Sequence, residues 1–220
     1  LTVELCVRAY RESGMTVMGH VACAAQTREF VHGVLERFES EGIENVILLR
    51  GAPPRGSDSF VPAEGGFAHA TDIIQHAREN FDFGIAAACY PEGHPESPDL
   101  DSDLRYTKMK VDQGAEFLIT QLFYDNDYYY DFVDRARRAG IDVPIIPGLM
   151  PILNASQIRR ITDLSGATIP ADLDRQLEQH ADDNRAVRQI GIEHTLRQAQ
   201  ELMANNVPGV HFYVLNRRYS

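Results

Sequence analysis

The stretch Asn45-Val-Ile-Leu-Leu-Arg-Gly51 decides the fold class of this sequence. Its apolar residues follow one another directly, whereas a strand with one face in water alternates apolar and polar residues. A continuous apolar run that ends in a charged residue and a glycine is typical of a parallel strand covered by helices on both faces. We therefore predict a buried parallel strand over residues 45–51.

Strands and helices alternate on both sides of this run. Other apolar runs of strand length lie at 16–23, 83–90, 117–124, 144–149 and 209–215. Helical spacing of apolar residues predicts helices at about 1–14, 30–42, 67–81, 101–114, 127–140, 156–165 and 182–205. This succession predicts an α/β fold with a parallel sheet. Six strands fit either a doubly wound open sheet or part of a (β/α)8 barrel.

Composition and charge narrow the class of protein. The 220 residues include 21 basic and 32 acidic side chains, for a net charge of −11, which argues against nucleic acid or an anionic membrane as the main partner. Charges and helix breakers interrupt every apolar run well before the roughly 18 residues that a membrane span needs. The three cysteines, Cys6, Cys23 and Cys89, are widely spaced, as expected for small buried side chains in a reducing cytoplasm.

Polar side chains gather where the predicted strands end, and each has a structural alternative to a ligand-binding role. His20, inside an apolar run, could equally be a hydrogen-bonded core histidine. Arg50, beside Gly51, suits a phosphate or forms a structural salt bridge. Gln121 can donate and accept at once, as a heterocycle such as a pterin requires, or is an amide satisfied by nearby backbone.

The stretch Tyr90-Pro-Glu-Gly-His-Pro-Glu96 is the most unusual in the chain. Glu92 and His94 alone supply too few ligands for a metal, and we expect no metal site. An aromatic ring and an imidazole in a proline-stiffened loop suit stacking and hydrogen bonding to a cofactor instead. No Walker loop, Gly-x-Gly-x-x-Gly, Gly-x-Ser-x-Gly or His-Glu-x-x-His motif occurs. The residues alone indicate an α/β enzyme with a site at the strand ends.

Six motifs in order carry a family resemblance. They are Leu49-Arg-Gly-Ala-Pro-Pro54, Ala88-Cys-Tyr-Pro-Glu-Gly-His-Pro-Glu96, Lys110-Val-Asp-Gln-Gly-Ala115, Ile119-Thr-Gln-Leu-Phe-Tyr-Asp125, Ile146-Pro-Gly-Leu-Met-Pro151 and His211-Phe-Tyr-Val-Leu-Asn-Arg217. From about His20 to its last residue the chain resembles the methylenetetrahydrofolate reductase family. The resemblance implies a TIM barrel that carries FAD at the carboxyl ends of its strands. It also implies reduction of methylenetetrahydrofolate to methyltetrahydrofolate by NADH or NADPH, which supplies methyl groups for methionine.

The resemblance also implies roles for individual residues. The positions that match the family's flavin contacts are His20, Arg50, Gly51, His69, Ala70, Tyr90, His94, Asp103 and Lys110. Arg50 and Lys110 would suit the pyrophosphate, and the aromatic and imidazole groups the rings and the ribityl chain. The positions that match folate contacts are Gln121, Gln157 and Arg217. Gln121 is expected to hold the pterin and to serve in catalysis, and Arg217 to bind the negatively charged tail of folate.

Four positions depart from the family's cofactor shell. Ala52 stands where the family usually has Asp, His69 where it has Tyr, Tyr106 where it has Asn, and Met109 where it has Arg. The family's first strand, with its catalytic Glu, would lie upstream of this sequence. We therefore expect residues 1–220 to be one TIM-barrel catalytic domain, truncated at both ends, with the last six strand–helix units.

Three hypotheses follow for the function. The first is a cytoplasmic, FAD-dependent oxidoreductase of one-carbon metabolism that acts on a small folate substrate. The second, motivated by the altered cofactor shell, is a variant that passes hydride directly from the nicotinamide to folate. The third, motivated by Ala52 and the absent Glu, is a non-catalytic folate- or nucleotide-binding relative. Assembly into a homo-oligomer is left open.

Overall fold

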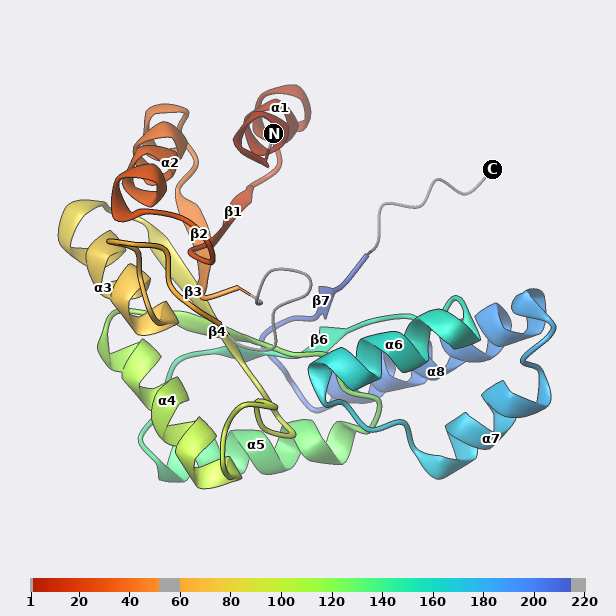
Figure 1. Ribbon diagram of the computed structural model, residues 1–220. Coiled ribbons are helices and arrows are strands. Elements are labelled where there is room, and N and C mark those ends of the chain that lie inside the picture. The colour runs from red at the N-terminus through yellow and green to blue at the C-terminus, as the bar shows by residue number, and fades with distance from the viewer. Residues whose placement is uncertain (1, 52–59, 215–220) are drawn as a thin grey trace. The chain divides into compact units, whose positions relative to one another are not determined.

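The computed structural model describes residues 2–51 and 60–214 of the chain, and strands alternate with helices through most of this length (Figure 1). The strands are β1 (Met18–Ala22), β2 (Asn45–Leu49), β3 (Gly84–Cys89), β4 (Phe117–Thr120), β5 (Ile145–Ile146), β6 (Gly148–Leu149) and β7 (His211–Phe212). The helices are α1 (Thr2–Ser13), α2 (Arg28–Ser40), α3 (Ala70–Asn80), α4 (Leu100–Asp112), α5 (Asn126–Arg138), α6 (Ala155–Ser165), α7 (Ala171–Gln179) and α8 (Asn184–Ala204). The predicted α/β class is confirmed.

Strand order decides between the two predicted architectures. Strands β1 to β5 form one sheet in the order β1-β2-β3-β4-β5, without the reversal at which a doubly wound sheet switches direction. Strands β1 and β2 pair in parallel, from Met18 opposite Asn45 to Ala22 opposite Leu49. Strands β2 and β3 also pair in parallel, from Asn45 opposite Gly84 to Ile47 opposite Ala86. Parallel strands that follow one another in chain order are the arrangement of a (β/α)8 barrel, as predicted.

The chain divides into two compact units. Unit 1 comprises Leu1–Ala88 and Thr107–Leu118, and unit 2 comprises Cys89–Tyr106 and Ile119–Ser220. The single domain expected over residues 1–220 stays a prediction.

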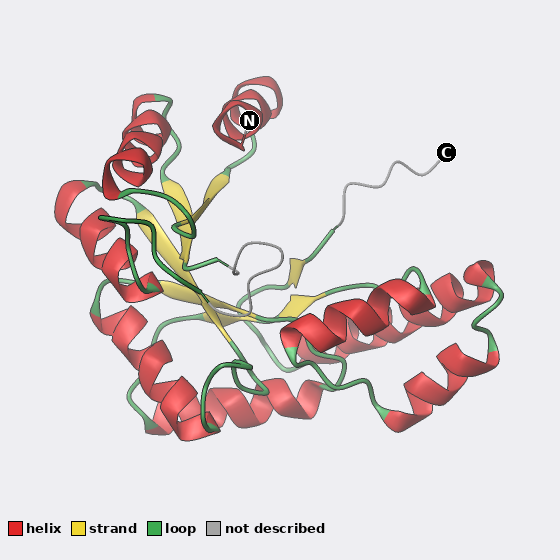
Figure 2. Cartoon of the chain, viewed as in Figure 1, coloured by secondary structure: helices red, strands yellow, loops and turns green. Residues whose placement is uncertain are grey.

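In unit 1, the helices cover one face of the strands (Figure 2). Val46 and Leu48 of β2 are fully buried, whereas Ile47 and Leu49, which point to the opposite face, are only half-buried. Gly19 of β1 allows α2 to approach closely, because a Cβ atom there would lie 2.7 Å from the Phe38 ring. The expectation that β2 is buried on both faces is thus met on one face only. The helices of this unit cover one face of the strands (Figure 2), and this accounts for the difference.

In unit 2, the strand predicted at 144–149 is two short strands. Pro147 separates β5 from β6, and it has no backbone N–H to continue a ladder. Its carbonyl instead accepts the His211 N–H at 2.9 Å, and β6 pairs in parallel with β7, Gly148 opposite His211. The second half of the predicted strand therefore belongs to a different pairing from the first half.

Helix α7 was not expected from the sequence. Its only buried residues are Leu173 and Leu177, so the apolar stripe is too short to stand out. Pro170 before the helix and Asp172 in its first turn are the start signals that the sequence does contain. Leu173 and Leu177 join a core cluster in unit 2, which also includes Leu122, Tyr124, Met150, Ile152, Ile158, Ala167 and Val187. Among the described residues, no helix is long and apolar enough to cross a membrane.

Candidate functional site

The candidate residues fall into two sets, one in each unit. Unit 1 holds His20, Arg50, Gly51, His69, Ala70 and Lys110, and unit 2 holds Tyr90, His94, Asp103, Gln121 and Gln157. Ala52 and Arg217 lie outside the described residues.

Arg50 and Gly51 follow the carboxyl end of β2. The Arg50 guanidinium is half-buried and lies 4.7 Å from the centre of the Phe60 ring, and its Nε donates to the Gly51 carbonyl at 3.4 Å. The buried Cys23 thiol donates to the Arg50 carbonyl at 3.4 Å. Gly51 has a φ of +88°, and a Cβ atom there would lie 2.8 Å from the Cβ of Ala24. The local backbone therefore requires a glycine here.

His20 lies in the middle of β1, two residues before the strand ends, and its side chain is exposed. The reading as a buried core histidine is therefore wrong for the described residues. Its neighbours Gly19 and Val21 are buried, and the alternation along a strand turns His20 to the opposite face.

His69 and Ala70 lie at the start of α3, where the helix has an internal cap. The Asp72 carboxylate accepts the N–H groups of Ala68 at 3.1 Å and of His69 at 3.0 Å. The Asp72 carboxylate thus satisfies the N–H groups of the N-cap residue and of the residue before it, and its negative charge suits the positive end of the helix dipole. An anionic ligand at this helix start would compete with Asp72.

Lys110 lies on α4 and fixes the end of β3. Its half-buried ammonium donates to the Ala88 carbonyl at 2.8 Å. On the same helix, Tyr106 and Met109 are 51% and 48% exposed, so neither of these large apolar side chains packs into a core.

A small pocket in unit 2 lies where β3 and β4 end. Its empty volume is about 160 Å³, open solvent included, and eight residues line it: Tyr90, Pro91, Glu92, Gly93, Gln121, Leu122, Ser165 and Ala167. The Gln121 N–H donates to the Cys89 carbonyl at 2.7 Å, which places the segments that follow the two strands side by side. The pocket thus joins Tyr90 and Gln121, two of the predicted residues.

The oxygen of the Gln121 side-chain amide accepts a hydrogen bond from the backbone of the next residue. This atom, Oε1, accepts the Leu122 N–H at 2.9 Å, and this donor fixes which end of the amide is oxygen. The group that Gln121 can offer a ligand is therefore the Nε2 amide, a donor. The alternative role, an amide satisfied by nearby backbone, therefore applies to Oε1. Gln121 as a whole is only half-buried.

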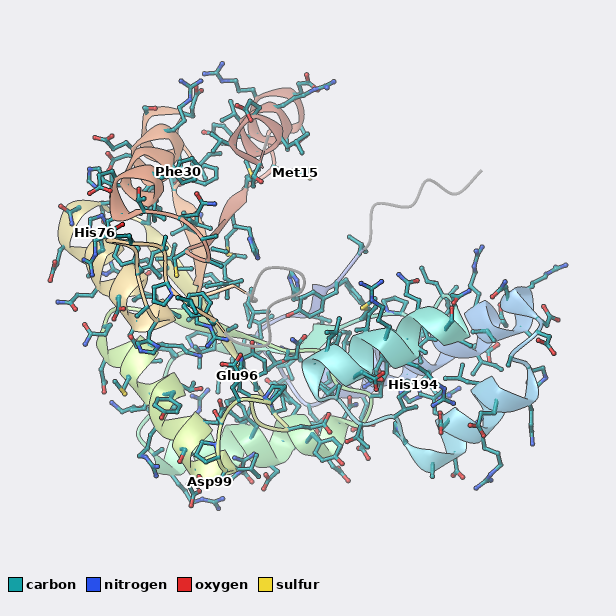
Figure 3. The ribbon with its side chains drawn as sticks, viewed as in Figure 1. Met15, Phe30, His76, Glu96, Asp99 and His194 are labelled. Atoms are coloured by element: carbon teal, nitrogen blue, oxygen red, sulfur yellow. The ribbon has the colours of Figure 1, made fainter. Side chains whose placement is uncertain are left out.

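Tyr90 and His94 contact each other in the loop that follows β3. Their ring centres are 4.6 Å apart with an interplanar angle of 74°, an edge-to-face contact. Gly93 permits the turn between them, because its φ is +90° and its N–H donates to the Tyr90 carbonyl at 3.0 Å. His94 Nδ1 accepts the N–H of Glu96, which is labelled in Figure 3, at 3.0 Å. In the neutral imidazole this leaves Nε2 as the donor.

Asp103 is buried and serves the same loop from α4. Only 4% of its surface is exposed, and its Oδ1 accepts the Ser97 hydroxyl at 3.1 Å. It therefore holds the end of the loop that carries Tyr90 and His94.

Glu92 is a residue whose role the sequence did not reveal. Both of its carboxylate oxygens accept the Thr168 N–H, at 3.2 and 3.0 Å. Partial burial raises the pKa of Glu92, the bond from Thr168 opposes this rise, and the negative charge of Asp125 adds to it. Thr168 is 76 residues away in sequence, so no local pattern indicates the contact.

Gln157 does not line the pocket. It is half-buried in the first turn of α6, where its backbone N–H is capped by the Asn154 side chain at 3.1 Å. The other end of the same helix supplies Ser165, and the following turn Ala167, to the pocket wall. Among the described residues, no group of three His, Cys, Asp or Glu side chains is placed to hold a metal ion.

Comparison with solved structures shows the fold. An uncharacterized protein from Clostridium thermocellum that binds two copies of 5-methyl-5,6,7,8-tetrahydrofolic acid matches with a TM-score of 0.56 at 16% identity, over 98% of this chain and 83% of that one. An oxaloacetate acetylhydrolase in complex with oxalate matches with a TM-score of 0.51 at 12% identity, over 93% and 75%. At these identities the likeness concerns the fold alone.

Comparison with known sequences shows the family. Methylenetetrahydrofolate reductase (NADH) 1 of Arabidopsis thaliana is 40% identical and covers 98% of this chain, which spans 38% of that protein. The 5,10-methylenetetrahydrofolate reductase of Escherichia coli is 34% identical over 93% of this chain and 67% of its own length. The family model described as methylenetetrahydrofolate reductase matches residues 1–220. The chain belongs to the methylenetetrahydrofolate reductase family.

Proposed function

We propose that the protein containing this chain reduces methylenetetrahydrofolate to methyltetrahydrofolate, with NADH or NADPH as the hydride donor. In this reaction the folate takes up one proton and one hydride, and the hydride comes from NADH or NADPH, which is oxidised to NAD⁺ or NADP⁺. The observation that carries the proposal is the pocket at the ends of β3 and β4, in which the Gln121 amide lies beside Tyr90, in a chain of this family. The cytoplasmic location belongs to the same proposal.

Gln121 binds the pterin in this proposal. Its Oε1 is occupied by the Leu122 N–H, so Nε2 donates to an acceptor on the heterocycle and fixes its orientation. Gln157 and Arg217 are assigned to the rest of the folate. Arg217 would pair with the carboxylates of the tail, for which a guanidinium is well suited.

The chemistry of residues in each unit supports FAD as the cofactor. In unit 1, the half-buried Arg50 guanidinium suits a phosphate, and in unit 2, the Tyr90 ring in contact with the His94 imidazole suits a flat, polar-edged ring. Bound FAD supplies a two-electron carrier between the nicotinamide and the folate. Arg50 and Lys110 would hold its pyrophosphate. The remaining assigned positions, which are His20, Gly51, His69, Ala70 and Asp103, would line its rings and chain.

A flavin-independent reduction is the second candidate. Tyr106 and Met109 stand on α4 where the resemblance leads us to expect Asn and Arg, and both are about half exposed. Met109 lacks the charge of Arg, and Tyr106 offers a ring hydroxyl in place of the Asn amide, which motivates direct transfer from nicotinamide to folate.

The visible spectrum of the purified protein tests these functions. Bound yellow flavin that NADH bleaches, followed by folate-dependent reoxidation, supports the FAD route. A colourless protein that oxidises NADH only when folate is present supports direct transfer. Folate binding without any turnover leaves the non-catalytic relative and overturns the proposed reaction.

Deuterium labelling separates the two catalytic routes a second time. In direct transfer, deuterium from 4-deuterated NADH appears in the methyl group of the product. By the FAD route, the deuterium exchanges with solvent if the folate is added only after the flavin has been reduced. The new hydrogen of the methyl group then comes from water.

A further inference from the structure

Two segments far apart in sequence meet beside the pocket of unit 2. One is the loop after β3, residues 90–97, which carries Tyr90 and His94 and is called the 90–97 loop below. The other is the turn at the end of α6, residues 165–168, called the α6 turn. Gly166 ends α6 with a φ of +74°, and a Cβ atom there would lie 3.3 Å from the Cγ of Pro95. The two segments are therefore in direct contact.

The carboxylate of Glu92 stabilises this contact by a hydrogen bond between the two segments. The Glu92 carboxylate reaches from the 90–97 loop to the Thr168 N–H, which lies within 3.2 Å of both carboxylate oxygens. Hydrogen bonds with an ionised partner are about twice as strong as neutral ones. Since Glu92 is partly buried, water competes less for its oxygens than it would at an open surface.

The 90–97 loop is also held from α5. The Arg135 guanidinium, of whose side chain 17% is exposed, donates to the Pro91 carbonyl at 3.1 Å, and its Nε pairs with Asp131 at 2.7 Å. The loop is thus anchored to α5 through Pro91. Glu92, the next residue of the loop, bonds to Thr168 of the α6 turn.

Both segments contribute residues to the lining of the same pocket. Tyr90 belongs to the loop, whereas Ser165 and Ala167 belong to the α6 turn, and both of the latter are buried. Helix α6 also carries Gln157 in its first turn. Gln157 and the α6 turn are therefore joined by one continuous helix of 11 residues.

We propose that Glu92 is a positioning residue that joins the loop assigned to the cofactor to the helix assigned to folate. This inference rests on the proposed function, which assigns the 90–97 loop to the cofactor and α6 to folate. The link between the two segments, called the joint below, rests on the Glu92–Thr168 hydrogen bond. Loss of the joint loosens the pocket walls, so substrate binding suffers more than the reaction of bound substrate.

The test compares Glu92→Ala with Glu92→Gln in the whole protein. Gln keeps a carbonyl oxygen that can accept the Thr168 N–H, whereas Ala keeps none. We expect hydrogen exchange at the Thr168 amide to be about tenfold faster in the Ala variant and within about threefold of wild type in the Gln variant. We expect the KM for methylenetetrahydrofolate to rise about fivefold in the Ala variant, with kcat within about twofold, and Gln to restore most of the loss.

Glu178→Ala is the matched control, because Glu178 is an exposed carboxylate of the same unit and bonds to Arg159 of α6 without touching the pocket. It should leave the Thr168 exchange rate and the KM unchanged. Where the Ala variant does not fold, Glu92→Asp replaces it, because a side chain one methylene shorter no longer reaches Thr168.

Each outcome decides one part of the inference. An unchanged Thr168 exchange rate in Glu92→Ala overturns the joint. Faster exchange with an unchanged KM, or a fall in kcat alone, overturns its positioning role. A protein without reductase activity overturns the proposed function instead, and the exchange rates still decide whether the joint exists.

Discussion

At the residue scale, Gln121 is the side chain on which the substrate assignment depends. Replacing Gln121 with Ala removes the Nε2 donor, and a lost hydrogen bond to a ligand of this kind costs about 1–3 kcal/mol. We expect kcat/KM for methylenetetrahydrofolate to fall about tenfold to a hundredfold. NADH oxidation with an artificial electron acceptor should stay within about twofold of wild type. An equal loss in both assays would show that Gln121 supports the fold or the cofactor and not the pterin.

Arg50 tests the cofactor assignment in the same way. The Arg50→Ala variant loses the cation that stacks on Phe60, and we expect it to retain less flavin after purification and dialysis. Arg50→Lys keeps the charge but not the planar guanidinium, and should retain an intermediate amount. The ratio of flavin absorbance to protein absorbance is the measurement. Wild-type occupancy in Arg50→Ala contradicts the role.

The sequence could indicate Tyr90 and Gln121 as neighbours because each lies toward the carboxyl end of a predicted parallel strand, and such ends meet at one edge of a sheet. It could not indicate Thr168 or Ser165. These residues reach the pocket through the packing of α6, which is a long-range contact without a local pattern. Glu92 was visible in the sequence, but its role depends on that same contact.

At the element scale, two helical glycines should respond in opposite ways to substitution by Ala. Gly191 on α8 packs against the chain at Ile152, and a Cβ atom would lie 2.1 Å from the Ile152 carbonyl oxygen. Gly33 on α2 has no atom within 4 Å of that position. Ala is favoured over Gly in a helix by about 1 kcal/mol, but a backbone clash outweighs this gain.

We therefore expect Gly191→Ala to lower the free energy of unfolding by at least about 2 kcal/mol. Gly33→Ala should raise it by about 0.5–1 kcal/mol. Urea unfolding followed by circular dichroism measures both. A stabilised Gly191→Ala variant would mean that α8 does not approach Ile152 as described.

Helices α2 and α3 share a histidine pair, from which we expect the free energy of unfolding to depend on pH. His32 Nδ1 lies 3.0 Å from Nε2 of His76, which is labelled in Figure 3. Burial, with the neighbouring charges of His32 and Arg28, lowers the pKa of His76 from its ordinary value of 6.5. A depressed histidine pKa contributes stability above the ordinary value, and this contribution is lost as the pH falls toward the folded-state pKa.

The free energy of unfolding should thus decrease between about pH 7.5 and pH 5.5, and less steeply in His76→Gln. His180→Gln is the control, because His180 is an exposed residue at the end of α7 and bonds within its own helix. Equal pH slopes in the wild type and in His76→Gln would contradict this role of the pair.

The elements themselves were largely predictable. Strands β1 to β4 and all helices except α7 lie where the apolar residues predict them. Each of these strands contains a clear apolar run, and each of these helices has apolar residues at helical spacing over several turns. The split at Pro147 was less visible. Proline in a predicted strand permits an interruption, but only the pairing of β6 with β7 shows that the two halves have different partners.

At the scale of the whole molecule, the assigned residues are divided between the two units. Arg50 and Lys110, the cations expected to meet phosphates, belong to unit 1, and Tyr90 and Gln121 line the pocket of unit 2. The family match extends over residues 1–220, while the chain spans 38% of the length of its Arabidopsis thaliana relative. The activity is therefore a property to be measured on the whole protein.

The most direct test of the account is the amount of methyltetrahydrofolate formed from methylenetetrahydrofolate and NADH or NADPH by the purified protein, measured by mass spectrometry beside the loss of nicotinamide absorbance. We predict one methyltetrahydrofolate for each nicotinamide oxidised, with the yield falling in Gln121→Ala. Folate bound to the protein without any methyltetrahydrofolate formed, with either nucleotide and with added FAD, would contradict the account.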